Sequence, residues 1–282
     1  MAIYKELIMS VAPINGTGLY YVTTGEGLPC LVMHGGLGFD HTYLHPWLDP
    51  LGDLLHLVYY DHRGNGRSGR PARETMTHAQ FAADADALAS HLGFDKVAVI
   101  GHSYGGFIAL EFALRYPHRL SHLILLDTAP ALNYGEEILA NALRKGATEE
   151  MVTILHANFA SDEDMRQKFP KIWPLYFKTF NADIAQRLVE NCIITTSGRA
   201  VEGESEAYNV IPRLAEIKMP TLILVGRDDF ICPPSQAHII YEGIAHSELV
   251  IFENSGHLPY VEEPEVFFKD VEDWFKQWHH DG

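Results

Sequence analysis

Residues 97–106 of the chain read Val97-Ala98-Val99-Ile100-Gly101-His102-Ser103-Tyr104-Gly105-Gly106. The first four are an apolar run typical of a buried strand, and the apolar run at 107–114 is typical of a helix. A Gly-x-Ser-x-Gly motif between a strand and a helix predicts a nucleophile elbow, a strained turn that holds the serine Oγ clear of the backbone. Glycine is expected at both ends of the motif because the strand and the helix approach closely there. Ser103 is therefore the candidate nucleophile.

A serine hydroxyl is a weak nucleophile at neutral pH, so it needs a base that is itself oriented by a third group. After such an elbow, the partners of the serine follow along the sequence in the order acid, then histidine. The predicted strand 221–225 leads to Asp228 and Asp229, and the predicted strand 248–252 leads to Ser255-Gly256-His257. Residues that follow parallel strands meet at one edge of a sheet, where such sheets hold their ligands. The order predicts a triad of Ser103, Asp229 and His257.

The identity of the acid leaves alternatives open. Asp228 and Asp229 are neighbours, and neighbours in an extended segment point to opposite sides, so only one is expected to reach the histidine. We favour Asp229. Asp127 follows another predicted strand, and we interpret it as a turn or cap residue before Ala129-Pro130.

A developing oxyanion needs hydrogen-bond donors, and two backbone N–H groups are candidates. One belongs to Tyr104, directly after the nucleophile, and the other to the loop after the third strand. That loop reads His34-Gly35-Gly36-Leu37-Gly38, and we expect Gly36 to supply the second donor. His102, beside the nucleophile, is expected to be a packed residue and not a second base.

The rest of the chain predicts an α/β fold with a mostly parallel central sheet flanked by helices. An antiparallel pair is expected at 3–10 and 18–23, followed by strands at 29–33, 55–60, 96–101, 121–127, 221–225 and 248–252. Strands alternating with helices favour parallel pairing. The alternation stops at 131–214, which predicts a helical cap between two halves of the core domain, 1–130 and 215–282.

The predicted cap contains four helical segments and many aromatic residues. The helices are expected at Glu136–Lys145, Glu149–Phe159, Asp162–Phe180 and Ala182–Asn191. Ligand pockets are usually apolar with a few polar groups, so Trp173, Tyr176 and Phe177 are candidates for substrate contact. An acidic run, Glu202, Glu204 and Glu206, follows; it is either a solvated loop or a binding element.

Composition narrows the class of protein further. The formal charge of −16 disfavours binding to nucleic acid or to an anionic membrane. No apolar run is long enough to cross a bilayer, and no signal peptide is evident. Cys30, Cys192 and Cys232 fit packed thiols in a reducing compartment, so we expect a cytoplasmic protein. The predicted catalytic residues point to a small-molecule substrate. No metal-ligand spacing or cofactor fingerprint is visible, so neither a metal nor a cofactor is expected.

Several motifs together resemble the α/β-hydrolases, in the branch of proline iminopeptidases and related esterases. They are His34-Gly35-Gly36, Asp61-His62-Arg63-Gly64-Asn65-Gly66-Arg67-Ser68, the elbow at Ser103, the stretch 226–233 and Ser255-Gly256-His257. The resemblance implies a capped α/β-hydrolase fold, a structural role for Arg63, and a cap carboxylate such as Glu206 that could hold a substrate's amino group.

The chain also departs from iminopeptidases in two places. They usually have a proline where this chain has Leu37, and Gly-Gly-Ser-Trp-Gly where it has Gly-His-Ser-Tyr-Gly. The departures favour hydrolysis of a carboxylic ester or lactone. An aminopeptidase and a ligand receptor without turnover remain the alternatives.

Overall fold

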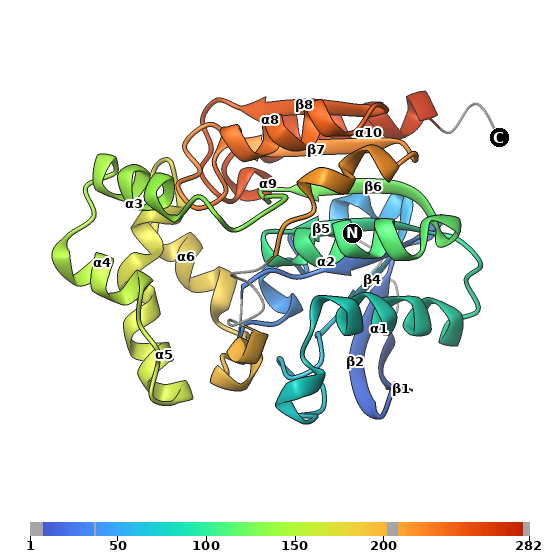
Figure 1. Cartoon of the computed structure of the whole chain (residues 1–282), viewed down its shortest axis with the longest axis horizontal. Coiled ribbons are helices and arrows are strands. Elements are labelled where there is room, and N and C mark those ends of the chain that lie inside the picture. The colour runs from blue at the N-terminus through green and yellow to red at the C-terminus, as the bar shows by residue number, and fades with distance from the viewer. Residues whose placement is uncertain (1–7, 37, 202–207, 279–282) are drawn as a thin grey trace, which may run out of the picture.

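A central sheet with helices on both faces forms the body of the protein (Figure 1). The computed structural model describes residues 8–36, 38–201 and 208–278. Within them, the sheet has eight strands in the order β1-β2-β4-β3-β5-β6-β7-β8. The strands are β1 (Ile8–Ile14), β2 (Thr17–Thr24), β3 (Leu28–Met33), β4 (Leu55–Tyr60), β5 (Val97–His102), β6 (Leu120–Leu126), β7 (Thr221–Gly226) and β8 (Ser247–Phe252).

The sheet is parallel from β4 to β8, whereas β1 and β2 form an antiparallel hairpin that joins β4. The hairpin turns at Asn15 and Gly16, whose φ values are 45° and 77°. Positive φ at both positions fits a type I′ turn, for which Asn-Gly is the preferred sequence. The first strand therefore extends to Ile14, beyond the predicted end at residue 10; residues 1–7 lie outside the described part.

Helices connect the strands and form the segment between β6 and β7. They are α1 (His78–His91), α2 (Tyr104–Arg115), α3 (Gly135–Arg144), α4 (Glu149–Leu155), α5 (Asp162–Lys168), α6 (Ala182–Val189), α8 (Pro234–Gly243), α9 (Pro259–Glu262) and α10 (Pro264–Trp278). Short 3₁₀ helices lie at His41–Tyr43, Asp49–Asp53, Arg73–Thr75, Pro117–Arg119, Phe169–Tyr176, Thr196–Val201 and Ile211–Glu216. No helix in the described ranges is long and apolar enough to span a membrane.

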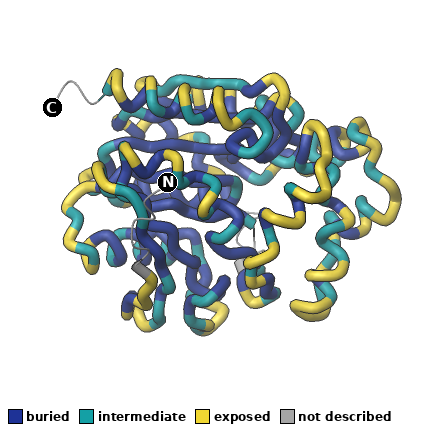
Figure 2. Tube along the Cα trace, turned by 180° about the vertical axis from the view of Figure 1, so that it is seen from behind, coloured by how far each residue is buried: buried dark blue, intermediate teal, exposed yellow. Residues whose placement is uncertain are grey.

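Except for β8 at the edge of the sheet, the parallel strands are mostly buried on both faces, so their residues alternate between two cores. Leu31, Val99 and Leu125 face a core formed with α1, α2 and α8. Val32 and Ile100 face a second core formed with α10 and α6. Figure 2 shows the strands as a buried centre, with the exposed trace concentrated on the helices and loops around it. Such double burial explains why these strands read as continuous apolar runs.

The segment between β6 and β7 lies to one side of the sheet as α3 to α6 (Figure 1). In its described part, its strand-like pairing is one isolated bridge, Ala131 with Asn209. The predicted helix Asp162–Phe180 is wrong, because α5 ends at Lys168 and a 3₁₀ helix containing Pro170 and Pro174 follows. Proline lacks the N–H that an α-helix needs and clashes with the preceding turn.

The loop after β4 is held to α1 by a buried ion pair. Arg63 Nε donates to Asp84 Oδ2 at 2.5 Å and Nη2 donates to Oδ1 at 2.6 Å. Both side chains are 2% exposed, so the pair is bidentate and desolvated. This geometry gives Arg63 the structural role that the resemblance implies.

We predict that Asp84→Ala lowers the free energy of unfolding by about 3–5 kcal/mol, because it leaves a buried guanidinium uncompensated. Asp86 is the matched control, since it also lies on α1 and pairs with an arginine, Arg119, but is 29% exposed. Asp86→Ala should cost less than about 1 kcal/mol. Unfolding in urea measures the free energy of unfolding of both variants. Equal losses of stability would contradict the structural role of the Arg63–Asp84 pair.

Candidate active site

The candidate site lies where the strand order changes direction, at the carboxyl ends of β3 and β5. From β3 the chain passes to β4 on one side, and from β4 it crosses back to β5 on the other side of β3. This reversal opens a crevice between the loops that follow β3 and β5. Ser103 lies in the turn between β5 and α2, with φ 55° and ψ −121°. A positive φ is strained for a serine, as expected for an elbow that presents its side chain.

The elbow is possible because glycines bring three elements into contact. A Cβ on Gly105 would lie 2.0 Å from the Met33 carbonyl oxygen, at the end of β3. A Cβ on Gly101 would lie 2.6 Å from the Gly105 oxygen. Both positions therefore exclude any side chain, which confirms the expectation for the two motif glycines.

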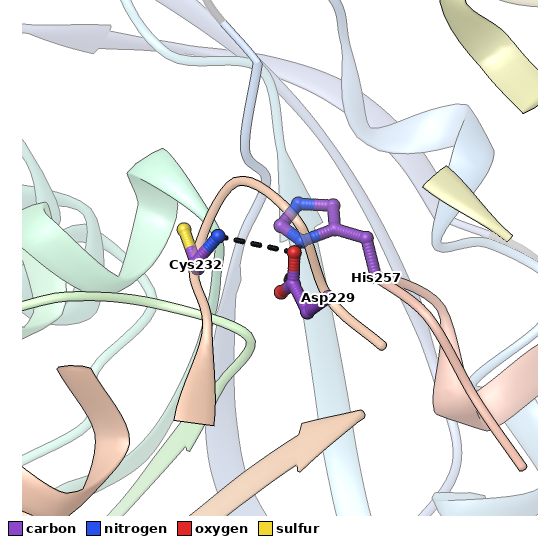
Figure 3. A group of neighbouring side chains, drawn as sticks. All are labelled: Asp229, Cys232 and His257. Carbon is purple, nitrogen blue, oxygen red and sulfur yellow. Dashed lines mark hydrogen bonds and ion pairs between the residues drawn. The ribbon is translucent and has the colours of Figure 1, made fainter. Parts of the chain in front are cut away.

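His257 and Asp229 form a buried hydrogen-bonded pair beside the elbow. The Nδ1–H of His257 donates to Asp229 Oδ2 at 2.7 Å, and the two side chains are 4% and 0% exposed. Figure 3 shows the ring and the carboxylate facing each other from different loops. With its proton on Nδ1, the ring keeps Nε2 as its basic nitrogen.

The Asp229 carboxylate is held ionised by its surroundings. Its Oδ1 accepts the N–H groups of Ile231 at 2.9 Å and Cys232 at 3.0 Å. Burial alone would raise the pKa of Asp229, but the charge and hydrogen bond of His257, together with these two N–H groups, lower it below the ordinary value. The group can therefore stabilise a positive charge on the ring.

Asp228 points elsewhere, as expected for its neighbour in an extended segment. Its carboxylate pairs with Lys178, and its backbone N–H donates to the Ser255 carbonyl at 3.0 Å. Asp229, and not Asp228, therefore contacts the histidine.

His102 is buried, as expected, but it also links the two sides of the site. Its Nε2–H donates to the His257 carbonyl at 3.1 Å, and its Nδ1 accepts from the Tyr43 hydroxyl at 2.8 Å. The Tyr43 oxygen in turn accepts the N–H of Gly35. Burial, followed by the proximity of His257, lowers the pKa of His102 to about 3, so the ring is neutral and works as a fixed donor and acceptor. Tyr43 was not predicted from the sequence, because it lies outside the motifs, five residues after the loop 34–38.

The loop after β3 lies against the elbow. Gly36 has φ +61°, and a Cβ there would lie 2.7 Å from the Phe39 ring. Gly36 and Tyr104, the two predicted oxyanion donors, line the same cavity as Ser103 and His257. Leu37 lies outside the described residues.

A cavity of about 330 Å³ extends from Ser103 into the segment between β6 and β7. It contains the three aromatic candidates, Trp173, Tyr176 and Phe177, in its lining. The remaining lining is also mostly apolar and aromatic; among the described residues it includes Arg199 but no aspartate or glutamate. Glu206, the fourth candidate, lies outside the described residues, as do Glu202 and Glu204.

Tyr176 joins the insertion to the histidine loop. Its backbone carbonyl accepts the N–H of His257 at 2.7 Å, and its ring meets the His257 ring edge-on at 5.4 Å between centroids. A Cβ on Gly256 would lie 2.4 Å from the same carbonyl oxygen, so glycine is required before the histidine.

Two groups of side chains in the described ranges combine possible metal ligands. In the first, Cys232 Sγ lies within 4.8 Å of ligand atoms of Asp229 and His257 (Figure 3). Burial, followed by the Asp229 charge, raises the pKa of this thiol well above its ordinary value, so it is neutral; its sulfur accepts a hydrogen bond from the Tyr134 hydroxyl at 3.9 Å. The second group lies under the loop after β4, where His41 Nδ1 contacts Asp61 at 2.5 Å and Arg67 contacts Asp40 at 2.8 Å. In both groups, hydrogen bonds and ion pairs explain why the side chains lie close together, and no metal ion is needed to explain it.

Comparisons with known proteins identify the family to which the chain belongs. A family model described as alpha/beta hydrolase fold matches residues 29–264. The proline iminopeptidase PfmaB of Pestalotiopsis fici is 33% identical, over 92% of this chain and 96% of that protein. A proline iminopeptidase of Lactobacillus crispatus is 29% identical, over 96% and 99%. Among solved structures, the enol-lactonase of Burkholderia xenovorans matches with a TM-score of 0.76 and 24% identity, over 95% and 100%.

The chain therefore belongs to the alpha/beta hydrolase family, in its proline iminopeptidase-like branch, and it is a hydrolase. The fold class and the enzyme class predicted from the sequence are confirmed. The likeness to the enol-lactonase supports the fold alone.

The two neighbouring aspartates give a direct test of the site. Asp229→Asn should lower kcat by about 10⁴-fold, because it removes the charge that stabilises the ring cation. Asp228→Asn is the matched control and should change kcat by less than about threefold, since it loses only a partly exposed ion pair. Steady-state kinetics on one ester substrate measures both; a reversed order would assign the acid to Asp228.

Proposed function

We propose that the chain is a serine hydrolase that cleaves a carboxylic ester or lactone of a small molecule. The observation that carries the proposal is the strained Ser103 in the lining of a mostly apolar cavity that is also lined by His257, whose ring is hydrogen-bonded to the buried Asp229. In this proposal Ser103 is the nucleophile, His257 the base and Asp229 the group that orients and stabilises it. Residues 131–214 serve as a cap that shapes the cavity.

The reaction proceeds through an acyl-enzyme. His257 takes the hydroxyl proton as Ser103 Oγ bonds to the carbonyl carbon, and returns it to the alcohol oxygen as that group leaves. Water then attacks the acyl carbon with His257 again as base, which releases the acid and restores the serine. The N–H groups of Gly36 and Tyr104 stabilise the oxyanion in both halves. A lactone follows the same steps and leaves as a single hydroxy acid.

The lining of the cavity disfavours a substrate that carries an ammonium group. An ammonium group transferred from water into an apolar cavity needs a carboxylate partner. The described lining is mostly aromatic and aliphatic; its one guanidinium, that of Arg199, would repel an ammonium group, and it includes no aspartate or glutamate. An ester or lactone carries no charge at its reacting end and needs no such partner.

The second candidate is an aminopeptidase of the proline iminopeptidase type. The identities of 29–33% to proline iminopeptidases, over more than nine-tenths of each chain, favour it. It requires a carboxylate near the cavity, and the acidic run Glu202, Glu204 and Glu206 follows Arg199 closely in the sequence.

Ser103→Ala tests the nucleophile. It should lower kcat by about 10⁶-fold and abolish covalent labelling by a fluorophosphonate, with the unfolding midpoint retained. The control is Ser255→Ala, which changes another buried serine that does not line the cavity. This variant should still be labelled at Ser103. Turnover near the original rate in a folded Ser103→Ala variant would remove the acyl-enzyme mechanism. One round of labelling by an ester, without steady turnover of any substrate in the original protein, would indicate a receptor.

A substrate panel separates the two hydrolase candidates. We expect nitrophenyl esters and lactones to be hydrolysed and prolyl anilides to be poor substrates. Replacing Glu202, Glu204 and Glu206 together by Gln should then change ester kcat/KM by less than about threefold, as for solvated surface charges. Efficient prolyl anilide cleavage that the triple variant loses, with ester cleavage retained, would establish the aminopeptidase.

A further inference from the structure

Asp127 lies between the elbow and the turn that holds Asp229. It follows β6 directly, and its N–H donates to the Leu224 carbonyl of β7 at 2.8 Å. On the other side, the N–H of Ser103 donates to the Leu126 carbonyl at 2.9 Å. The φ of Asp127 is +46°, which is uncommon for a residue other than glycine, and its side chain is fully buried. The sequence predicts a turn or cap residue at this position. Its positive φ and its complete burial indicate a further role for the carboxyl group.

The two oxygens of Asp127 have different surroundings. Oδ1 accepts the N–H of Gly226 at 2.9 Å. Oδ2 is buried and receives no N–H or O–H from the described residues. The carboxylate of Asp229 lies close enough to the Asp127 carboxyl for a hydrogen bond between the two side chains. Two carboxylates in contact repel unless one of them carries a proton, which then forms the hydrogen bond between them.

The surroundings decide which carboxyl carries the proton. Burial, followed by the charge of Asp229, raises the pKa of Asp127 well above its ordinary value, and the single N–H of Gly226 only partly opposes this. Asp229 has the opposite shift because of its imidazole and its two N–H donors. Asp127 is therefore the neutral partner and Asp229 the ionised one at neutral pH.

We propose that Asp127 is a positioning residue, whose carboxyl O–H donates a hydrogen bond to Asp229 and holds that carboxylate in its orientation toward His257. The proposal rests on the triad of the proposed function. Asp229 then accepts from four groups: two backbone N–H groups, the imidazole and Asp127. Its rotamer is fixed from every side, and the histidine that depends on it is fixed as well.

Asp127→Asn separates this role from that of an ionised second acid. The amide oxygen can accept the N–H of Gly226, and the NH₂ group can donate to Asp229 as the neutral carboxyl does. We expect kcat/KM within about threefold of the original, and an acid limb of the pH profile whose apparent pKa moves by less than about 0.3. Cys232, and Glu262 and Tyr260 on α9, also face Asp127 and are unchanged.

If Asp127 were ionised, its negative charge would favour the protonated base. Asp127→Asn would then lower the apparent pKa of the acid limb, by about one unit or more for a buried neighbour. That result would overturn the proposal, and so would a fall in kcat beyond tenfold in this variant.

Asp127→Gly removes the donor without opposing the positive φ. We expect kcat to fall about tenfold to a hundredfold with KM changed less, because the carboxylate and the base lose a fixed orientation. Asn at the same position should restore the rate. Original kcat and pH profile in Asp127→Gly would overturn the proposal, and if that variant does not fold, the pH profile of Asp127→Asn decides. Failure of Ser103→Ala to abolish turnover tests the triad separately.

Discussion

The contact between Gly105 on α2 and the carbonyl of Met33 at the end of β3 constrains the whole site. No side chain fits between them, so the elbow that holds Ser103 and the loop that holds Gly36 have one separation. In the proposed mechanism, that separation sets where a substrate carbonyl can lie between the proposed nucleophile, Ser103, and the proposed oxyanion donors. The contact is made by backbone atoms alone and leaves the surrounding side chains free to vary with the substrate.

The electrostatics of the site depend on several buried titratable groups that hold different protonation states. His102 is neutral because burial and the proximity of His257 disfavour its cation. Asp229 is ionised because three donors outweigh its burial, and Asp127 is neutral because it has one donor and a charged neighbour. The arrangement leaves one negative charge beside His257 and no competing base. A site built this way places its negative charge on the Asp229 carboxylate, in contact with the His257 ring.

The sequence could predict the parts of the site that depend on strand ends. Ser103, Asp229 and His257 each follow an apolar run, and parallel strands bring such positions to one edge without knowledge of any long-range contact. Contacts between distant segments were not predictable: the Gly35–Tyr43–His102 chain and the approach of Asp127 to Asp229 depend on the three-dimensional packing. Two local signals were available and were missed. Asn15-Gly16 marks the hairpin turn, and Pro170 marks the end of α5.

The hydrogen bond from His257 to the Tyr176 carbonyl has a consequence for how substrate enters. This bond joins the insertion between β6 and β7 to the loop that carries the proposed base. Gly256 lies so close to the same carbonyl that no side chain would fit between them. Lifting this part of the insertion from the core would release the histidine loop at the same time. Access to the cavity and the position of His257 would thereby be coupled. The proposed base would return to its place only when this part of the insertion closed again over the bound substrate. In the proposed mechanism, Ser103 would then lack its base for as long as the cavity is open.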